Sequence, residues 1–109
     1  MKILLCSEFY KPHIGGVEIH TEVLANYLSQ NNQITIATTV DKNRKKKFYN
    51  NRKIKIREFN IHGSLVKGYE GNVDDYENFL LNSKFDIIFF NTGQQWTFDL
   101  SLNILEKIK

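Results

Sequence analysis

Short continuous apolar segments alternate along this chain with longer segments whose apolar residues recur every third or fourth position. Segments 2–7 (KILLCS) and 33–40 (QITIATTV) are short and rich in aliphatic or β-branched residues, which is typical of strands buried on both faces. Between them, the apolar stripe from Val17 through Thr21 to Leu28 has helical spacing. This order predicts a strand, an amphipathic helix and a second parallel strand.

The second half of the chain continues the alternation. Segment 53–59 (KIKIREF) places Ile54 and Ile56 on one face and lysines on the other, as expected of an edge strand. Segment 62–71 is rich in glycine and predicts a connection. Segment 85–90 (FDIIFF) is the most apolar run, and we expect a central strand there.

Two further helices are predicted in this half. Asn72 is a favourable N-cap, Asp74 and Asp75 suit the first turn, and an apolar stripe including Tyr76 follows. A last helix begins near Thr97.

The chain of 109 residues has the length of one domain. The predicted element order is β-α-β-β-α-β-α, which indicates an α/β fold with a Rossmann-like parallel sheet and helices on both faces. With strands near 2–7, 33–40, 53–59 and 85–91, we expect the spatial order 3-2-1-4.

The most informative loop, residues 12–20 (PHIGGVEIH), leads from the first strand into the first helix. Gly15 and Gly16 lack a Cβ, so a phosphate can approach the backbone where free N–H groups and the helix dipole favour an anion. Their spacing fits neither the dinucleotide-binding fingerprint nor the P-loop. A tight turn that requires glycine is the alternative interpretation.

The opening of the chain resembles that of family 4-type glycosyltransferases of the GT-B fold. The resemblance covers residues 1–39 well and is weaker beyond them. Its features are the loop with a proline and paired glycines, a glutamate two residues later, the helical Leu-Ala-x-x-Leu pattern and the second strand. Here these are Pro12, Gly15, Gly16, Glu18, Leu24, Ala25, Leu28 and segment 33–39.

The resemblance implies an enzyme with two Rossmann-like domains and an active site between them. It assigns the donor diphosphate to Gly15 and Gly16, acceptor binding to the N-terminal domain and the nucleotide sugar to the C-terminal domain. Transfer in the family usually retains the anomeric configuration, without a divalent metal or another cofactor. Because the donor domain and the strand that precedes the family's N-domain histidine would follow Lys109, residues 1–109 are expected to be an inactive part of the N-terminal domain.

A second loop, residues 91–96, follows the strongest predicted strand and would border the same cleft. Amide side chains bind sugar hydroxyls and an indole can stack on a pyranose ring, which makes Asn91, Gln94, Gln95 and Trp96 candidate acceptor contacts. Packing of the indole at the start of the last helix is the alternative. Many relatives carry a histidine in this loop, and this sequence does not.

Other candidate residues each have a plainer interpretation. His13 could contact acceptor or phosphate, or simply lie exposed in its loop. Glu18 could position a sugar, or stabilise the helix dipole. His20 is expected to be packed and partly buried, and His62 to lie on the surface. Cys6 is predicted to be an inert core thiol, and one cysteine with three scattered histidines predicts no metal site.

The basic residues are concentrated in one segment. Nine of the 15 lysines and arginines lie in residues 42–57, where no acidic residue occurs. A solvated loop is the commonest role of such a run; contact with anionic lipid is the next alternative, and nucleic-acid binding is the least favoured. The short apolar run at the N-terminus predicts no signal peptide, so we expect a cytoplasmic protein, peripheral at the inner membrane face if lipid binds.

Two functional classes follow from these patterns. The leading hypothesis is the N-terminal part of a glycosyltransferase that uses a nucleotide-sugar donor and a glycan or lipid-linked acceptor. The alternative is a non-catalytic Rossmann-like binding module, complete in itself.

Overall fold

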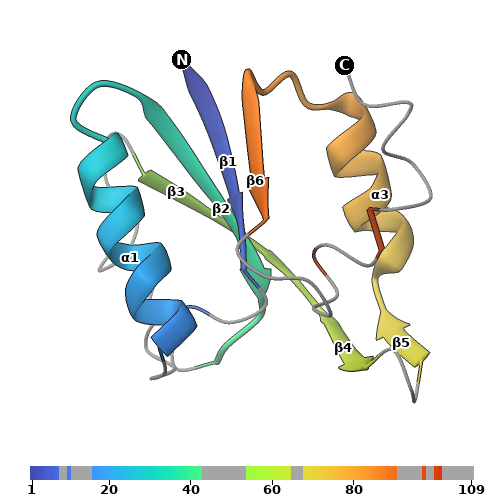
Figure 1. The fold of residues 1–109 in the computed structure, drawn as a ribbon. Helices are drawn as coiled ribbons and strands as arrows, with labels where there is room; N and C mark the ends of the chain where they lie inside the picture. Colours follow the sequence, from blue (N-terminus) through green and yellow to red (C-terminus); the bar gives the residue numbers. More distant parts are fainter. Residues whose placement is uncertain are drawn as a thin grey trace.

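The computed structural model describes residues 1–7, 10, 16–42, 54–64, 68–90, 97, 100 and 101. Its centre is a sheet of four parallel strands in the order β3-β2-β1-β6, so that β1 lies between β2 and β6 (Figure 1). The strands are β1 (Lys2–Cys6), β2 (Gln33–Thr39), β3 (Ile54–Phe59) and β6 (Ile87–Phe90). The α/β class and the parallel sheet predicted from the sequence are confirmed.

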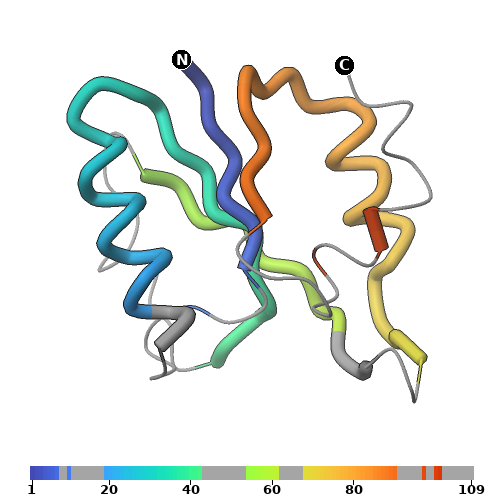
Figure 2. The backbone as a smooth tube through the Cα atoms, viewed as in Figure 1, coloured from blue at the N-terminus to red at the C-terminus, as the bar shows by residue number. Residues whose placement is uncertain are grey.

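The two described helices, α1 (Gly16–Leu28) and α3 (Val73–Asn82), lie on opposite faces of this sheet. The chain passes from α1 to β2 on one side and from α3 to β6 on the other (Figure 2). Successive strand residues point to opposite faces, so β1 sends Ile3 and Leu5 toward α1, and Leu4 and Cys6 toward α3. Both faces of the central strand are therefore buried.

Helix α1 packs through the stripe that its sequence predicts. Thr21 and Ala25 are buried and Leu24 is half-buried. His20 is exposed, so its predicted packing is wrong. It precedes the buried Thr21 by one residue, which turns its side chain by about 100° around the helix axis.

Helix α3 begins after Asn72, as predicted, but the Asn72 side chain makes no capping hydrogen bond. Its backbone N–H instead donates to the Asn60 carbonyl at 2.9 Å. The start of α3 is thus fixed by contact with the segment that follows β3, and not by a local cap.

The segment predicted as a glycine-rich connection contains a hairpin. Strands β4 (Ile61–Ser64) and β5 (Gly68–Gly71) pair antiparallel, with Ile61 opposite Gly71. The prediction missed it because each strand has four residues and the segment carries three glycines, which weakens any alternating pattern. The fully buried Ile61 joins the core between the sheet and α3.

The two outer strands of the described sheet differ from each other. β3 is an edge strand as predicted, with Ile54 and Ile56 buried and Lys55 and Arg57 exposed. The apolar run of β6 predicts a central strand, whereas the predicted order 3-2-1-4 places this strand last. In the described sheet β6 is the outer strand beside β1. Half of its side chains are exposed, including Phe89 at 41%, so its apolar sequence reflects more hydrophobic surface than the described residues cover.

Candidate functional site

The strand order reverses between β1 and β6. From β1 the chain moves outward to β2 and then β3, whereas β6 lies on the other side of β1. The last residues of the two strands, Cys6 and Phe90, are paired in register. Ligands of open α/β sheets bind at the carboxyl ends of the strands where the order reverses in this way. This edge therefore has the position at which such sheets bind their ligands.

Helix α1 supplies a helix N-terminus to the region that follows β1. It begins at Gly16, the second glycine of the predicted phosphate loop, and Glu18 lies in its first turn. The remaining predicted contacts lie outside the described residues: His13, Gly15, Asn91, Gln94, Gln95 and Trp96. Of the two predicted loops, the described structure therefore places the start of α1 and the strand end before Asn91.

A buried tyrosine links the end of β1 to Thr97, the first described residue after that second loop. The Tyr76 hydroxyl lies 2.5 Å from the Thr97 carbonyl oxygen and 3.7 Å from Cys6 Sγ. One hydroxyl carries one proton, and the shorter contact takes it. Phe90, at the start of the same interval, pairs with Cys6. Phe90 and Thr97, the described residues on either side of this interval, thus both connect to Cys6 at the end of β1, Thr97 through Tyr76.

Burial controls the titration of this cluster. It raises the pKa of the Cys6 thiol to about 12, against a smaller lowering effect of the neighbouring Tyr76 hydroxyl. Burial, with a smaller contribution from Cys6, also raises the pKa of Tyr76 above its ordinary value. Both groups are neutral near pH 7, so Cys6 is the unreactive core thiol that the sequence predicted.

Sequence reasoning treated Tyr76 as one more apolar residue of the α3 stripe and missed this link. A signal was present, because a tyrosine at a fully buried position has to satisfy its hydroxyl. Its partner could not be identified from the sequence, since Thr97 lies 21 residues away. Thr97 Oγ1 is also buried, without a hydrogen-bond partner among the residues that the structure describes.

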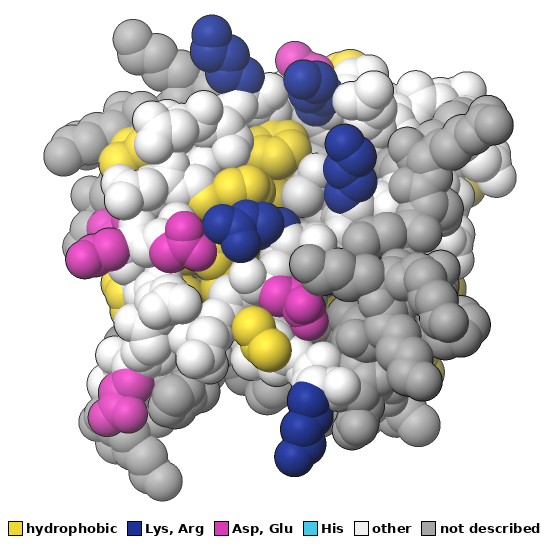
Figure 3. Space-filling model, turned by 180° about the vertical axis from the view of Figure 1, so that it is seen from behind, with side chains coloured by type: hydrophobic (Ala, Val, Ile, Leu, Met, Phe, Trp, Pro, Cys, Tyr) yellow, Lys and Arg dark blue, Asp and Glu magenta, His cyan; other side chains and the backbone are white. Residues whose placement is uncertain are grey.

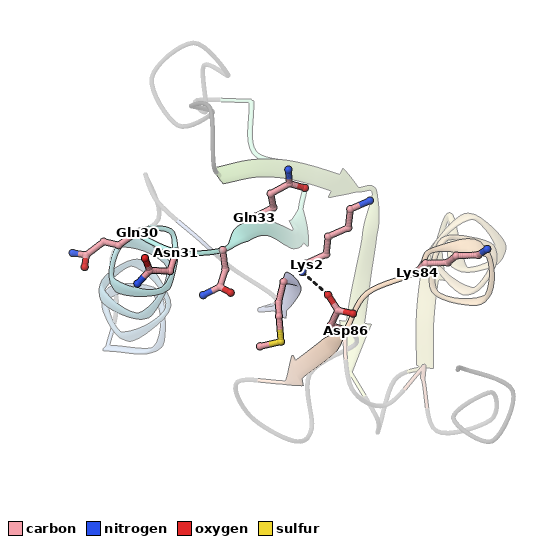
Figure 4. Close-up of a pocket in the computed structure, with 8 residues that line it drawn as sticks. Lys2, Gln30, Asn31, Gln33, Lys84 and Asp86 are labelled. Atoms are coloured by element: carbon pink, nitrogen blue, oxygen red, sulfur yellow. Dashed lines mark hydrogen bonds between the residues drawn. The ribbon is translucent and has the colours of Figure 1, made fainter.

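Two hollows lie at the opposite edge of the sheet, where the strands begin. The wider one is open and polar, and within it the Lys2 backbone N–H donates to Asp86 Oδ2 at 2.8 Å (Figure 4). The smaller one, of about 290 Å³, lies on the α3 face and is lined by Lys2, Gln33, Ile34, Thr35, Lys55, Ser83, Lys84 and Phe85. No sequence motif pointed to this edge.

The described ends of the basic segment have different surroundings. Lys42 and Lys55 are exposed. Arg57 forms an ion pair with Asp75 of α3, with 3.2 Å between Nη2 and Oδ2. Its guanidinium also lies 4.7 Å from the centre of the Phe59 ring. Arg57 is therefore part of the packing between β3 and α3 and is less available to an external anion than the two lysines.

Within the described ranges there is no group of three or more histidine, cysteine, aspartate or glutamate side chains that could hold a metal ion. None of the described helices is both long enough and apolar enough to cross a lipid bilayer. Comparisons of the chain with protein-family models, curated proteins and solved structures found no match.

Proposed function

We propose that this chain is the N-terminal, acceptor-side part of a GT-B-type glycosyltransferase. The observation that carries the proposal is the reversal of strand order between β1 and β6, combined with the start of α1 at Gly16. A helix N-terminus that opens with paired glycines at a reversal point suits a diphosphate. The resemblance of residues 1–39 to that enzyme family supplies the reaction.

In this proposal Gly15 and Gly16 receive the donor diphosphate. The first N–H groups of α1 have no carbonyl partner within the helix, and the helix dipole adds partial positive charge there. As the acceptor hydroxyl attacks the anomeric carbon, the bond to the diphosphate oxygen breaks and negative charge accumulates on the leaving group. Donors already aimed at that position stabilise the charge as it develops.

The acceptor lies on the β6 side of the same edge. His13, Glu18, Asn91, Gln94, Gln95 and Trp96 are the proposed contacts, by hydrogen bonds to sugar hydroxyls and stacking on the ring. The Tyr76–Thr97 hydrogen bond fixes the point where the chain leaves the second loop. Tyr76 is therefore a positioning residue in this proposal and contacts neither substrate.

The proposed partners are a nucleotide-sugar donor and a glycan or lipid-linked acceptor, with retention of configuration and no metal requirement. We place the enzyme in the cytoplasm, with the basic segment 42–57, apart from the ion-paired Arg57, in contact with anionic lipid at the inner membrane face. Each basic residue near such a surface contributes about 1 kcal/mol.

The test is Gly16→Val in the protein that the gene encodes, with nucleotide sugars offered as a panel and nucleoside diphosphate release as the readout. A branched side chain would obstruct close approach of the diphosphate. Losing one aimed donor costs about 3–4 kcal/mol, a loss of roughly a hundred- to a thousandfold in rate. The melting temperature should change little, because Gly16 is at the helix end and outside the strands.

Asn26→Val is the matched control, since it places the same side chain at an exposed position of α1. It should leave the rate unchanged. Near-normal melting together with near-normal turnover in Gly16→Val would contradict the diphosphate role. A rate that falls only in proportion to lost stability would show that the glycine serves the turn alone.

A further inference from the structure

The smaller hollow at the amino edge of the sheet combines several cations with neutral donors. Lys2 of β1 and Lys55 of β3 point to the α3 face, because they share that face with Leu4 and Phe59 in the alternation of their strands. Thr35 of β2 is paired with both strands and lies between them. Ser83 and Lys84 come from the segment after α3 and complete the lining.

The spacing of the strands brings the two strand lysines within reach of one anion. β2 separates β1 from β3, and Lys2 is level with Gln33, two residues before Thr35 and its partner Lys55, so the Lys2 and Lys55 backbones are about 12 Å apart. A lysine side chain spans about 6 Å, and an anion seated over Thr35 can contact both ammonium groups. Figure 4 shows the Lys2 side chain directed toward β3, whereas Lys84 extends over α3 and stands at the rim.

The charges of this hollow are not neutralised internally. Within the described part of the chain, the ammonium groups of Lys2, Lys55 and Lys84 form no ion pair. No carboxylate is among the described residues that line it. Asp86 belongs to the wider neighbouring hollow, where its carboxylate accepts from the Lys2 backbone. Seen from behind, most of the described basic side chains gather toward the end where the strands begin (Figure 3).

We infer that this hollow is a binding site for a phosphate group carried by a small ligand. Two ammonium groups balance a dianion, and the hydroxyls of Thr35 and Ser83 with the Gln33 amide supply neutral donors for its oxygens. A volume of about 290 Å³ suits a phosphate ester with a small organic group. The site lies at the edge opposite to the proposed glycosyl-transfer site and does not depend on it.

The test titrates inorganic phosphate into the protein and follows backbone amide signals by NMR. Saturable shifts are expected at Thr35, Ser83 and Gln33. Lys2→Gln and Lys55→Gln should each weaken the apparent affinity by roughly fivefold or more, because each removes a unit charge close to the anion. Both lysines are exposed, so circular dichroism should show an unchanged fold.

Lys42→Gln is the matched control, because it removes the same charge from an exposed lysine beyond the other end of β2. It should leave the affinity unchanged, as should Gly16→Val. An equal loss in Lys42→Gln would overturn the site in favour of general charge attraction. Shifts confined to Gly16 and its neighbours in α1, with none at Thr35, Ser83 and Gln33, or no saturation, would overturn it as well.

A second arm identifies the source of the phosphate group. Phosphatidylcholine vesicles that contain phosphatidic acid are added to the phosphate-bound protein. If the vesicles displace phosphate, and Lys2→Gln, a change outside the basic segment 42–57, abolishes vesicle binding at the hollow, the site is assigned to a lipid headgroup. Binding of glycerol 3-phosphate without displacement by the vesicles would assign it to a soluble phosphate ester.

Discussion

The two faces of the sheet are packed with different kinds of side chain. The α1 face is largely aliphatic, with six isoleucines and leucines from three strands around Ala25: Ile3, Leu5, Ile34, Ile36, Ile54 and Ile56. The α3 face is built around aromatic rings, in which Phe59 meets Tyr76 edge-on at 5.1 Å and Phe79 at 5.3 Å. Aliphatic packing depends mainly on volume, whereas rings and hydroxyls require particular orientations.

The two faces of the sheet also carry different parts of the proposed sites. The Tyr76 link to Thr97 and the lysine-lined hollow both lie on the α3 face. The α1 face contributes the start of its helix at Gly16. We therefore expect the α3 face to tolerate few substitutions even where volume is preserved, and the α1 face to accept volume-conserving changes. Three predictions test this comparison.

The largest effect is expected from Gly71→Ala, in the hairpin that carries Ile61 into the α3-face core. Gly71 has φ +115°, and a Cβ there would overlap the Asn60 carbonyl oxygen, which is backbone and cannot rotate away. The Asn60 carbonyl also accepts the Asn72 N–H at the start of α3. Urea denaturation should show a loss of about 4 kcal/mol or more in the free energy of unfolding.

Gly68→Ala is the control within the same hairpin. Gly68 has φ +83°, but no atom lies within 4 Å of the position of an added Cβ. Its cost should be confined to the left-handed backbone, about 1–2 kcal/mol. Equal losses for the two variants would mean that the contact with Asn60 does not constrain the α3 face.

The next effect is expected from Tyr76→Phe, which preserves the ring and removes the hydroxyl. The Thr97 carbonyl would lose its partner at 2.5 Å, and a buried polar group left unsatisfied costs about 1–3 kcal/mol. Tyr27→Phe makes the same change on α1, where the side chain is 70% exposed, and should change unfolding by less than about 0.5 kcal/mol. Similar small losses in both would show that the link between α3 and Thr97 contributes little.

How far the sequence could predict the fold depended on the regularity of each segment. The bounds of β1, β2 and β3 were predicted to within one residue at each end. A continuous or strictly alternating apolar pattern is typical of a strand, and its first and last residues can be read from the sequence alone. The predicted strand from residue 85 begins two residues later, at Ile87. Asp86 Oδ2 and the Asp86 N–H instead both bond to the Lys2 backbone, a tertiary contact that no local pattern encodes.

The candidate site also contains features that the local sequence predicts and features that depend on tertiary contacts. Paired glycines before a helical stripe predicted where α1 begins, since that signal is local. The Tyr76–Thr97 bond and the placement of Lys2 and Lys55 on either side of β2 join residues far apart in sequence. Their recognition needs the strand order and register, which the composition of each separate segment does not contain.

The smallest effect is expected from the exposed Arg57–Asp75 ion pair, which joins β3 to α3 at the surface. On the exposed surface of α1, by contrast, the apolar Val23 is 62% exposed. The two charged side chains are themselves 45% and 48% exposed. A double-mutant cycle with Arg57→Gln and Asp75→Asn should give a coupling of about 0.2–1 kcal/mol.

The Arg57–Asp75 coupling should shrink in 1 M salt, where the screening length falls to about 3 Å. Arg57→Gln alone should cost more than the coupling, because the guanidinium also lies over the Phe59 and Phe79 rings at 4.7 and 5.7 Å. That surplus should persist in salt, because ring contacts at this range are screened little. If the whole cost of Arg57→Gln disappeared in salt, Arg57 would contribute only an exposed ion pair. Its contacts with the Phe59 and Phe79 rings would then not stabilise the edge of the α3 face.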